Sequence, residues 1–186
     1  MNELEKLNLK IKRCKKCNLW KFRKNAVPGE GPIDAKIFFV GQNPGRNEDL
    51  KGKPFVGLSG KFLDKMLELA KIERKKVFIT GAVKCHTPKN RKPTKEEIEK
   101  CKHYLLKQIE IINPKIVVIL GEVALDALLS SKEKISKLHG KLIKKDKNYY
   151  FITFHPAAGM RFPKIREMMI KDFKKLGKLL KLKSVK

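Results

Sequence analysis

Four short apolar runs alternate with longer amphipathic segments along this chain. The runs are rich in Ile, Val, Phe and Thr, the composition of buried strands, and they cover residues 37–40, 77–80, 116–120 and 150–153. Each run is followed by a segment with apolar residues at helical spacing, and these segments cover residues 59–70, 94–112, 122–129 and 163–180. Strands that alternate with helices predict an α/β fold with a mostly parallel sheet covered by helices on both faces.

The start and the length of the chain add further expectations. Residues 1–14 have the pattern of an amphipathic helix without the apolar stretch of a signal peptide, and no run of about 18 apolar residues is present. We therefore expect a cytoplasmic protein that does not enter a membrane. A length of 186 residues suits one domain over 1–186, and a monomer is expected because the sheet uses the apolar faces of the helices.

The chain is strongly basic, with 45 Lys and Arg against 19 Asp and Glu and a net charge of +26. A charge of this sign favours polyanions, chiefly nucleic acid. The alternative is a solvated, lysine-rich surface of the kind that thermophile proteins carry, but such surfaces usually balance Lys with Glu, and this one does not. The charge thus predicts a nucleic-acid partner.

The most unusual sequences follow the predicted strands directly. They are GQNPG at 41–45, the segment at 81–93, the turn at Gly121 and HPAAGMR at 155–161. Ligands of parallel α/β sheets bind beyond the carboxyl ends of the strands, so these loops form the candidate site. Gly41 and Gly45 permit close approach of the backbone to a ligand, and Pro44 stiffens the turn.

Four cysteines occur in the chain: Cys14 and Cys17 with CxxC spacing, and Cys85 and Cys101 far downstream. Disulfides are uncommon in the cytoplasm, so four cysteines there favour metal ligation. Four thiolates satisfy either a tetrahedral zinc ion or an iron–sulfur cluster. Zinc sites more often pair two CxxC motifs, and the second motif is missing here.

Seven sequence motifs occur together over nearly the whole chain. In order they are CKKC, AVPGEGP, AKIFFVGQNPGRNED, GKPFVGLSGKFLDKML, VKCHTPKNRKPTKEEIEKC, IVVILGEVAL and FHPAAGMR. With these motifs the chain resembles the family 4 uracil-DNA glycosylases, the iron–sulfur branch of the uracil-DNA glycosylase superfamily. The resemblance implies a three-layer α/β/α sandwich with a four-stranded parallel sheet, and a 4Fe–4S cluster held by Cys14, Cys17, Cys85 and Cys101.

The same resemblance implies a DNA-repair hydrolase whose partner is DNA with deaminated bases. Such an enzyme flips a deaminated base, most often uracil, out of DNA and hydrolyses its N-glycosidic bond to leave an abasic site. No lysine stands out as a Schiff-base nucleophile, which fits a monofunctional glycosylase.

Roles for individual residues follow from the matched motifs. Phe55 resembles the stacking aromatic of the family, and His155 matches the histidine that donates a hydrogen bond to uracil O2 as that oxygen gains charge. Met160 has the character of a wedge between bases. Basic residues near the loops are expected to bind phosphates, and the candidates are Lys84, Arg91 and Arg161.

The first loop departs from the family pattern GEAPG. Gln42 replaces an acid, and because an amide takes no proton at neutral pH, we predict that Gln42 lines the pocket and is not a base. Asn43 restores the GxNPG pattern of the mismatch-specific and single-strand-selective branches, and we predict that it positions the water. Glu48 and Asp49 match an acidic pair of the family, and a solvated or loop-capping role for them is left open.

Gly81 stands where the family has an Asn that reads the edge of uracil. Loss of this amide suggests recognition that is less exclusive for uracil, or a preference for another deaminated base or a mismatch context, because a hydrogen-bonding side chain discriminates strongly between bases. Two other interpretations stay open. One is a non-catalytic iron–sulfur module that binds nucleic acid and has lost turnover through the changes at 42 and 81. The other is a zinc-stabilised RNA-binding or RNA-processing domain.

Overall fold

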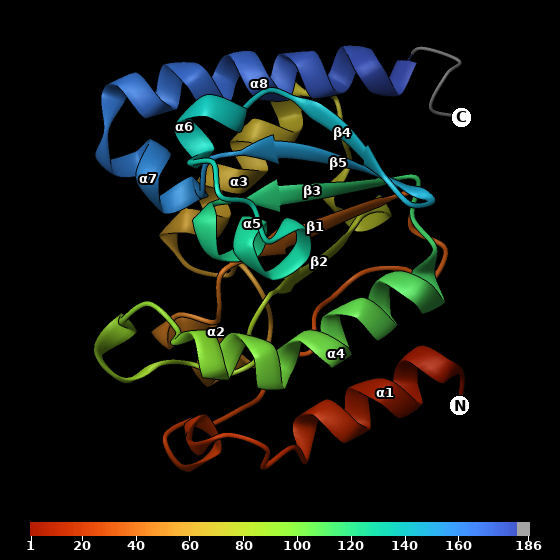
Figure 1. The fold of residues 1–186 in the computed structure, drawn as a ribbon, viewed down its shortest axis with the longest axis vertical. Helices are drawn as coiled ribbons and strands as arrows, with labels where there is room; N and C mark the ends of the chain where they lie inside the picture. Colours follow the sequence, from red (N-terminus) through yellow and green to blue (C-terminus); the bar gives the residue numbers. More distant parts are fainter. Residues whose placement is uncertain (182–186) are drawn as a thin grey trace.

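The computed structural model describes residues 1–181, and a central sheet with helices on both faces forms its core (Figure 1). The parallel strands are β1 (Ile37–Gly41), β2 (Phe78–Gly81), β3 (Ile116–Leu120) and β5 (Asn148–Thr153). One more strand, β4 (Leu142–Lys145), pairs antiparallel with β5, and the order across the sheet is β2-β1-β3-β5-β4. The predicted α/β class with a mostly parallel sheet is confirmed.

The predicted count of four strands is wrong, because β4 makes the sheet five-stranded and mixed. The sequence of β4, LIKK, holds two half-buried apolar residues followed by two exposed lysines. Such a short, charged strand is typical of a sheet edge and carries little apolar signal. A tight turn with Asp146 in the left-handed region, at φ +54°, joins it to β5.

Eight α-helices surround the sheet within residues 1–181. They are α1 (Glu3–Lys12), α2 (Arg46–Lys51), α3 (Leu58–Leu69), α4 (Lys95–Ile112), α5 (Glu122–Leu129), α6 (Ile135–Leu138), α7 (Pro156–Arg161) and α8 (Pro163–Lys181). The N-terminal helix and the four helices predicted after the strands are confirmed within a few residues. In Figure 1, α8, α3 and α7 lie on one side of the sheet, and α4, with α1 beyond it, lies on the other. In this part of the chain no helix has the length and apolar character needed to cross a bilayer.

Both faces of the sheet are buried, as β1 illustrates. Phe38 stacks on Phe78 with ring centroids 5.0 Å apart, and Phe39 stacks on Phe173 of α8 with centroids 6.4 Å apart. Neighbouring residues of a strand point to opposite faces, so Phe39 packs against α8 on one face while Phe38 stacks on the neighbouring strand β2 on the other. Parallel strands buried on both faces consist of continuous apolar residues, which explains why their positions could be predicted.

The carboxyl ends of the parallel strands bring the candidate loops together. β1 and β2 end side by side, with Gly41 paired to Gly81. After β3, the Gly121 amide donates to the Thr153 carbonyl at 3.0 Å, and Gly121 has a left-handed φ of +95°. A Cβ on Gly121 would lie 2.9 Å from His155 Cβ. Glycine at this turn therefore lets the backbone of His155 approach the end of β3 closely.

Candidate active site

A cavity of about 270 Å³ lies at the carboxyl ends of the parallel strands and is formed by the loops that follow β1, β2 and β5. Seven of the predicted site residues line it: Gln42, Asn43, Pro44, Gly45, Phe55, Gly81 and His155. Gly41 lies beneath the side chains of Phe55 and His155 at the floor of this cavity. A Cβ placed on Gly41 would lie 2.6 Å from Phe55 Cζ and 3.6 Å from His155 Nε2. The first distance is a clash and the second an ordinary contact, so glycine at 41 lets the Phe55 ring lie over the end of β1 beside His155.

His155 caps the N-terminus of α7, and this position fixes its tautomer. The Ala157 amide donates to His155 Nδ1 at 3.2 Å, so Nδ1 is an acceptor and the ring proton of the neutral imidazole is on Nε2. Nε2 faces the cavity beside Gly41. Burial lowers the pKa of His155 to about 4, against a smaller opposing effect of the Glu48 carboxylate. At neutral pH the side chain is thus an uncharged donor aimed at the cavity.

Phe55 packs beside this histidine, with ring centroids 5.8 Å apart and planes inclined by 30°. Its backbone is in the left-handed region at φ +51°, which is uncommon for a residue with a side chain. The ring edge rests on Gly41, and the ring lines the cavity. A flat aromatic wall next to a hydrogen-bond donor is suited to a planar ligand with a polar edge.

Glu48 and Asp49 of α2 both cap loops. Glu48 Oε1 accepts from the amides of Val56 and Gly57, each at 2.9 Å, and Asp49 accepts from the amide of Lys24 at 3.0 Å. Both carboxylates are buried, so of the two roles left open, the loop-capping one is confirmed. Glu48 also lines the cavity, and this was not anticipated. It brings a negative charge to the candidate site.

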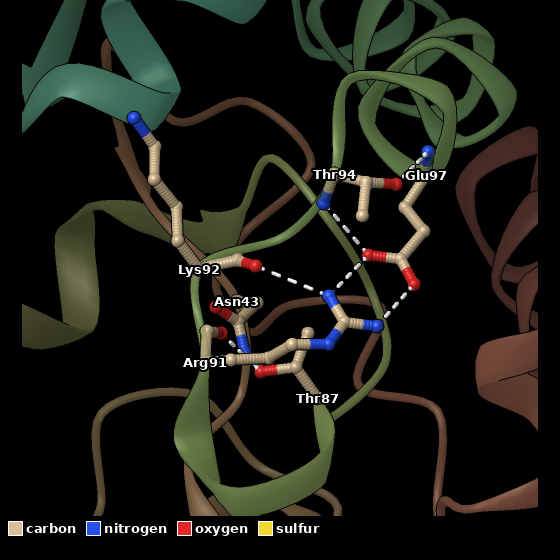
Figure 2. A network of polar contacts seen from close by, with 6 residues as sticks. All are labelled: Asn43, Thr87, Arg91, Lys92, Thr94 and Glu97. Carbon is tan, nitrogen blue, oxygen red and sulfur yellow. Dashed lines mark hydrogen bonds and ion pairs between the residues drawn. The ribbon is translucent and has the colours of Figure 1, made fainter.

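Asn43 is the first residue of a polar chain that leads to α4 (Figure 2). Its Nδ2 donates to the Pro44 carbonyl at 2.9 Å and to Thr87 Oγ1 at 3.3 Å, and Thr87 Oγ1 donates to the Arg91 carbonyl at 2.6 Å. Because these bonds use both Nδ2 protons, the acceptor Oδ1 is the free polar atom of this amide within residues 1–181. This series of polar contacts ends at Glu97, whose carboxylate binds both Arg91 and the Thr94 amide. Thr94 and Glu97 form a capping box at the start of α4.

The four cysteines line a second cavity, between α1, the η1 turn (Asn18–Lys21), the loop after β2 and α4. None of the four forms a disulfide, and burial raises the pKa of Cys101 to about 12. Arg23 Nη1 donates to Cys85 Sγ at 3.0 Å, and the Lys84 amide donates to Cys101 Sγ at 3.3 Å. In the described part of the chain, no three His, Cys, Asp or Glu side chains form a group that could hold a metal ion. The four cysteines line one shared cavity, and sulfur is the donor type that an iron–sulfur cluster requires.

The sequence pattern of the family described as the uracil DNA glycosylase superfamily matches residues 28–177. This chain belongs to the uracil-DNA glycosylase superfamily. It is similar to a type-4 uracil-DNA glycosylase of Sulfurisphaera tokodaii, with 46% identity over 96% of this chain and 86% of the relative. A type-4 uracil-DNA glycosylase of Thermotoga maritima is 40% identical over 96% and 95% of the two chains. A type-5 uracil-DNA glycosylase of Pyrobaculum aerophilum is 30% identical over 79% and 72%.

One residue predicted to bind DNA in this superfamily member lies in the interior. Lys84 is 1% exposed, and its Nζ donates to Thr80 Oγ1, the Gly81 carbonyl and Gln108 Oε1 at 2.6–2.8 Å. The prediction that Lys84 binds a phosphate is wrong. Burial lowers the pKa of Lys84 to about 7, against an opposing effect of Cys101 and Cys85. The lysine holds the end of β2 against α4.

The other three predicted DNA contacts lie at the surface of the molecule. Arg91 is half-exposed, and both of its terminal nitrogens bind Glu97, at 2.8 and 2.7 Å. Met160 and Arg161 end α7 and line a shallow hollow beside the cavity, together with Arg46 of α2. A phosphate that follows the rim would therefore meet positive side chains from two different helices.

Asn90 lines the cavity of this glycosylase fold and was missed in the sequence. It follows Lys89 in the η3 turn (Pro88–Asn90), and both residues have left-handed φ, +54° and +56°. Asn tolerates this conformation better than most residues, so the Pro-Lys-Asn sequence was the available signal. Asn90 enters the site from the same loop as Thr87.

Proposed function

We propose that this chain is a monofunctional uracil-DNA glycosylase that flips a deaminated base, most often uracil, out of DNA. It hydrolyses the N-glycosidic bond and leaves an abasic site. The observation that carries the proposal is that His155 Nε2 and the Phe55 ring face one cavity over Gly41. The type-4 relatives, similar over nearly the whole chain, support it. The enzyme would act as a cytoplasmic monomer, with residues 1–186 as one domain.

Base recognition starts with flipping, because the bond to be cleaved is out of reach inside a duplex. Met160 would occupy the gap left in the stack, while Arg161 and Arg91 would bind flanking phosphates. The uracil ring would lie on Phe55, and stacking of this kind contributes about 1–3 kcal/mol per base. Gly41, Pro44 and Gly45 would bring the backbone of the first loop close to the ring, with Gln42 at its polar edge.

Bond cleavage places negative charge on the leaving uracil and positive charge on the sugar. Neutral His155 would donate from Nε2 to uracil O2, so the hydrogen bond strengthens as charge develops. Glu48 would place its carboxylate near the cationic sugar. Asn43 Oδ1 would accept a hydrogen bond from the attacking water, because its Nδ2 is already held by Pro44 and Thr87. Such a site orients the water without a strong base.

A 4Fe–4S cluster would be held by Cys14, Cys17, Cys85 and Cys101. Four sulfur donors around a shared cavity suit either a cubane or a zinc ion, and the missing second CxxC motif favours the cubane. When bound, the cluster would supply a structural cross-link and no redox step. The cross-link would hold the start of the chain against the loop that carries Thr87 and Asn90.

The test of this function is excision from oligonucleotides that carry uracil, hypoxanthine, xanthine or thymine, opposite each base and in single strands. Alkali converts an abasic site into a strand break, which makes excision visible on a gel. Breakage at uracil is the expected result. A folded protein that breaks no strand but still binds DNA would instead support the non-catalytic module.

Gly81 is the position at which we expect base preference to change. A Cβ here would lie 2.8 Å from the Val83 carbonyl oxygen and 3.3 Å from Asn43 Cα, so any side chain requires the backbone to shift. We expect Gly81→Asn to raise the preference for uracil over hypoxanthine about tenfold or more, because the new amide discriminates between base edges. Gly81→Ala is the matched control, with the same crowding and no amide. Equal base preference in both variants would remove Gly81 as a determinant.

The pH dependence of excision tests the state of His155. Because its pKa is lowered to about 4, we expect a flat single-turnover rate between about pH 5 and 8, with no inflection near the ordinary value of about 6.5. The unfolded state takes up the proton first as the pH falls below about 6.5. The free energy of unfolding therefore keeps its full value above about pH 6.5 and decreases as the pH falls toward 4. An inflection near pH 6.5 would show that His155 titrates at its ordinary pKa, and a rate that rises as the pH falls through 6.5 would show that the charged form acts.

A further inference from the structure

Phe55 is held in a backbone conformation that it would not adopt unaided. Its φ of +51° lies in the left-handed region, where a side chain is strained. Strain of this kind persists only when the surrounding structure over-determines it. The contacts that impose it on Phe55 therefore also decide where its ring lies.

Three contacts hold the Phe55 turn from different directions. From the cavity side, Glu48 accepts from the amides that follow Phe55. From below, α3 lies so close that a Cβ on Gly60 would come within 1.9 Å of the Phe55 carbonyl oxygen. From outside, Arg74 Nη2 donates to the carbonyls of Pro54 and Phe55, at 3.0 and 3.2 Å.

Arg74 is itself fixed by an ion pair and does not line the cavity. It belongs to the η2 turn (Arg74–Lys76) ahead of β2, and its Nη1 donates to Asp64 Oδ1 of α3 at 2.7 Å. The guanidinium thus joins α3 to two successive carbonyls at the turn. A planar fork with several donors can do this, whereas a lysine ammonium concentrates its donors at one flexible point.

We propose that Arg74 is a positioning residue for base recognition, acting through Phe55. Asp64 holds the guanidinium, the guanidinium holds the carbonyls at 54 and 55, and the strained turn presents the Phe55 ring over Gly41 beside His155. This inference rests on the proposed function, because it requires a base to stack on Phe55. Without the clamp, the turn relaxes and the ring leaves its place over the cavity floor.

The measurements are single-turnover excision of uracil, inhibition by free uracil, and affinity for abasic DNA. Displacement of a positioning group by about 1 Å costs up to about 10²-fold in rate. We expect Arg74→Met to slow excision by about 10- to 100-fold and to weaken inhibition by free uracil. Affinity for abasic DNA, which has no base to stack, is expected to be unchanged. Arg74→Lys keeps the charge near Asp64 but is expected to restore only part of the rate, because it lacks the fork.

A double-mutant cycle with Phe55→Ala separates positioning from general destabilisation. If Arg74 acts through Phe55, Arg74→Met adds little to the loss already caused by Phe55→Ala. Lys75→Met is the matched control, since Lys75 is the next residue of η2 and forms an exposed ion pair with Glu73 at 3.3 Å. It is expected to leave all three measurements unchanged.

Two results would overturn the inference while wild-type excision of uracil stands. One is full additivity in the cycle, and the other is full rescue by Arg74→Lys. A wild-type protein that is folded but excises no uracil would instead overturn the proposed function, and the inference with it. Melting temperatures of all variants, compared at one pH, identify any loss that comes from unfolding.

Discussion

Replacing His155 with alanine is expected to slow uracil excision by about 10²–10³-fold, the usual cost of removing one donor that stabilises a developing oxyanion. The imidazole is neutral at working pH, and the Ala157 amide fixes its proton on Nε2, toward the cavity. No other histidine of the described chain lines this cavity to replace it. The loss is expected in the chemical step, because the hydrogen bond gains most of its strength as charge moves onto uracil.

Single-turnover rates and DNA affinities, measured together, check this expectation. Affinity for uracil-containing DNA, followed by fluorescence anisotropy, is expected to change little in His155→Ala, because the phosphate contacts stay. His103→Ala serves as the control, since His103 is an exposed histidine of α4 away from the cavity. A parallel loss of binding and rate would show that His155 shapes the site and does not act on the leaving group.

The sheet was predictable where burial on both faces dictates the sequence. β3 was placed to the residue, because all five of its positions are buried and apolar. β4 was not, because only two residues of LIKK pack inward and hairpin pairing with β5 supplies the rest. The short helix α7 was assigned to a loop for a similar reason. Its six residues are too few to show an apolar period, and His155 and Pro156 start it by capping.

The residues of the cavity were predictable only where a motif marks them. Gln42, Asn43, Phe55 and His155 lie in matched motifs, and all four line one cavity. Glu48 lies in a motif as well, but its burial depends on where the turn after α2 passes, which no local pattern encodes. The role of Lys84 was predicted wrongly because net charge does not show whether a particular side chain points to the solvent or to the interior. Its ammonium finds three oxygen acceptors between β2 and α4, and so a lysine can be buried there.

The role of Arg74 could not be predicted from the sequence either. In sequence it is one of 45 basic residues and stands directly before Lys75 and Lys76, and nothing there shows which of the three meets backbone carbonyls. In space it alone of these three bridges α3 and the Phe55 turn. Roles that depend on backbone acceptors brought together by folding leave no signature in composition or spacing.

Substituting Cys85 by serine is expected to abolish cluster binding and, with it, most of the activity. The four thiols come from two segments that are at least 68 residues apart in sequence (85 − 17 = 68), and the loop between Cys85 and α4 carries Thr87 and Asn90 into the active site. In Cys85→Ser, Arg23 also loses a sulfur acceptor at 3.0 Å. Since ligand binding to the native state alone adds to stability, the melting temperature is expected to fall as well.

Metal content distinguishes an iron–sulfur cluster from a zinc ion and from cysteines without a metal. Protein purified without oxygen is expected to contain four iron atoms and four labile sulfides per chain in the wild type, and neither in Cys85→Ser. The near-isosteric change keeps packing similar, so a loss of excision together with increased proteolysis at the 85–101 segment would trace to the missing cross-link. One zinc per chain would replace the cluster by the tetrahedral alternative. A metal-free wild type with full activity would show that the thiols have no ligand role, and that packing among α1, α4 and the loop after β2 holds the site on its own.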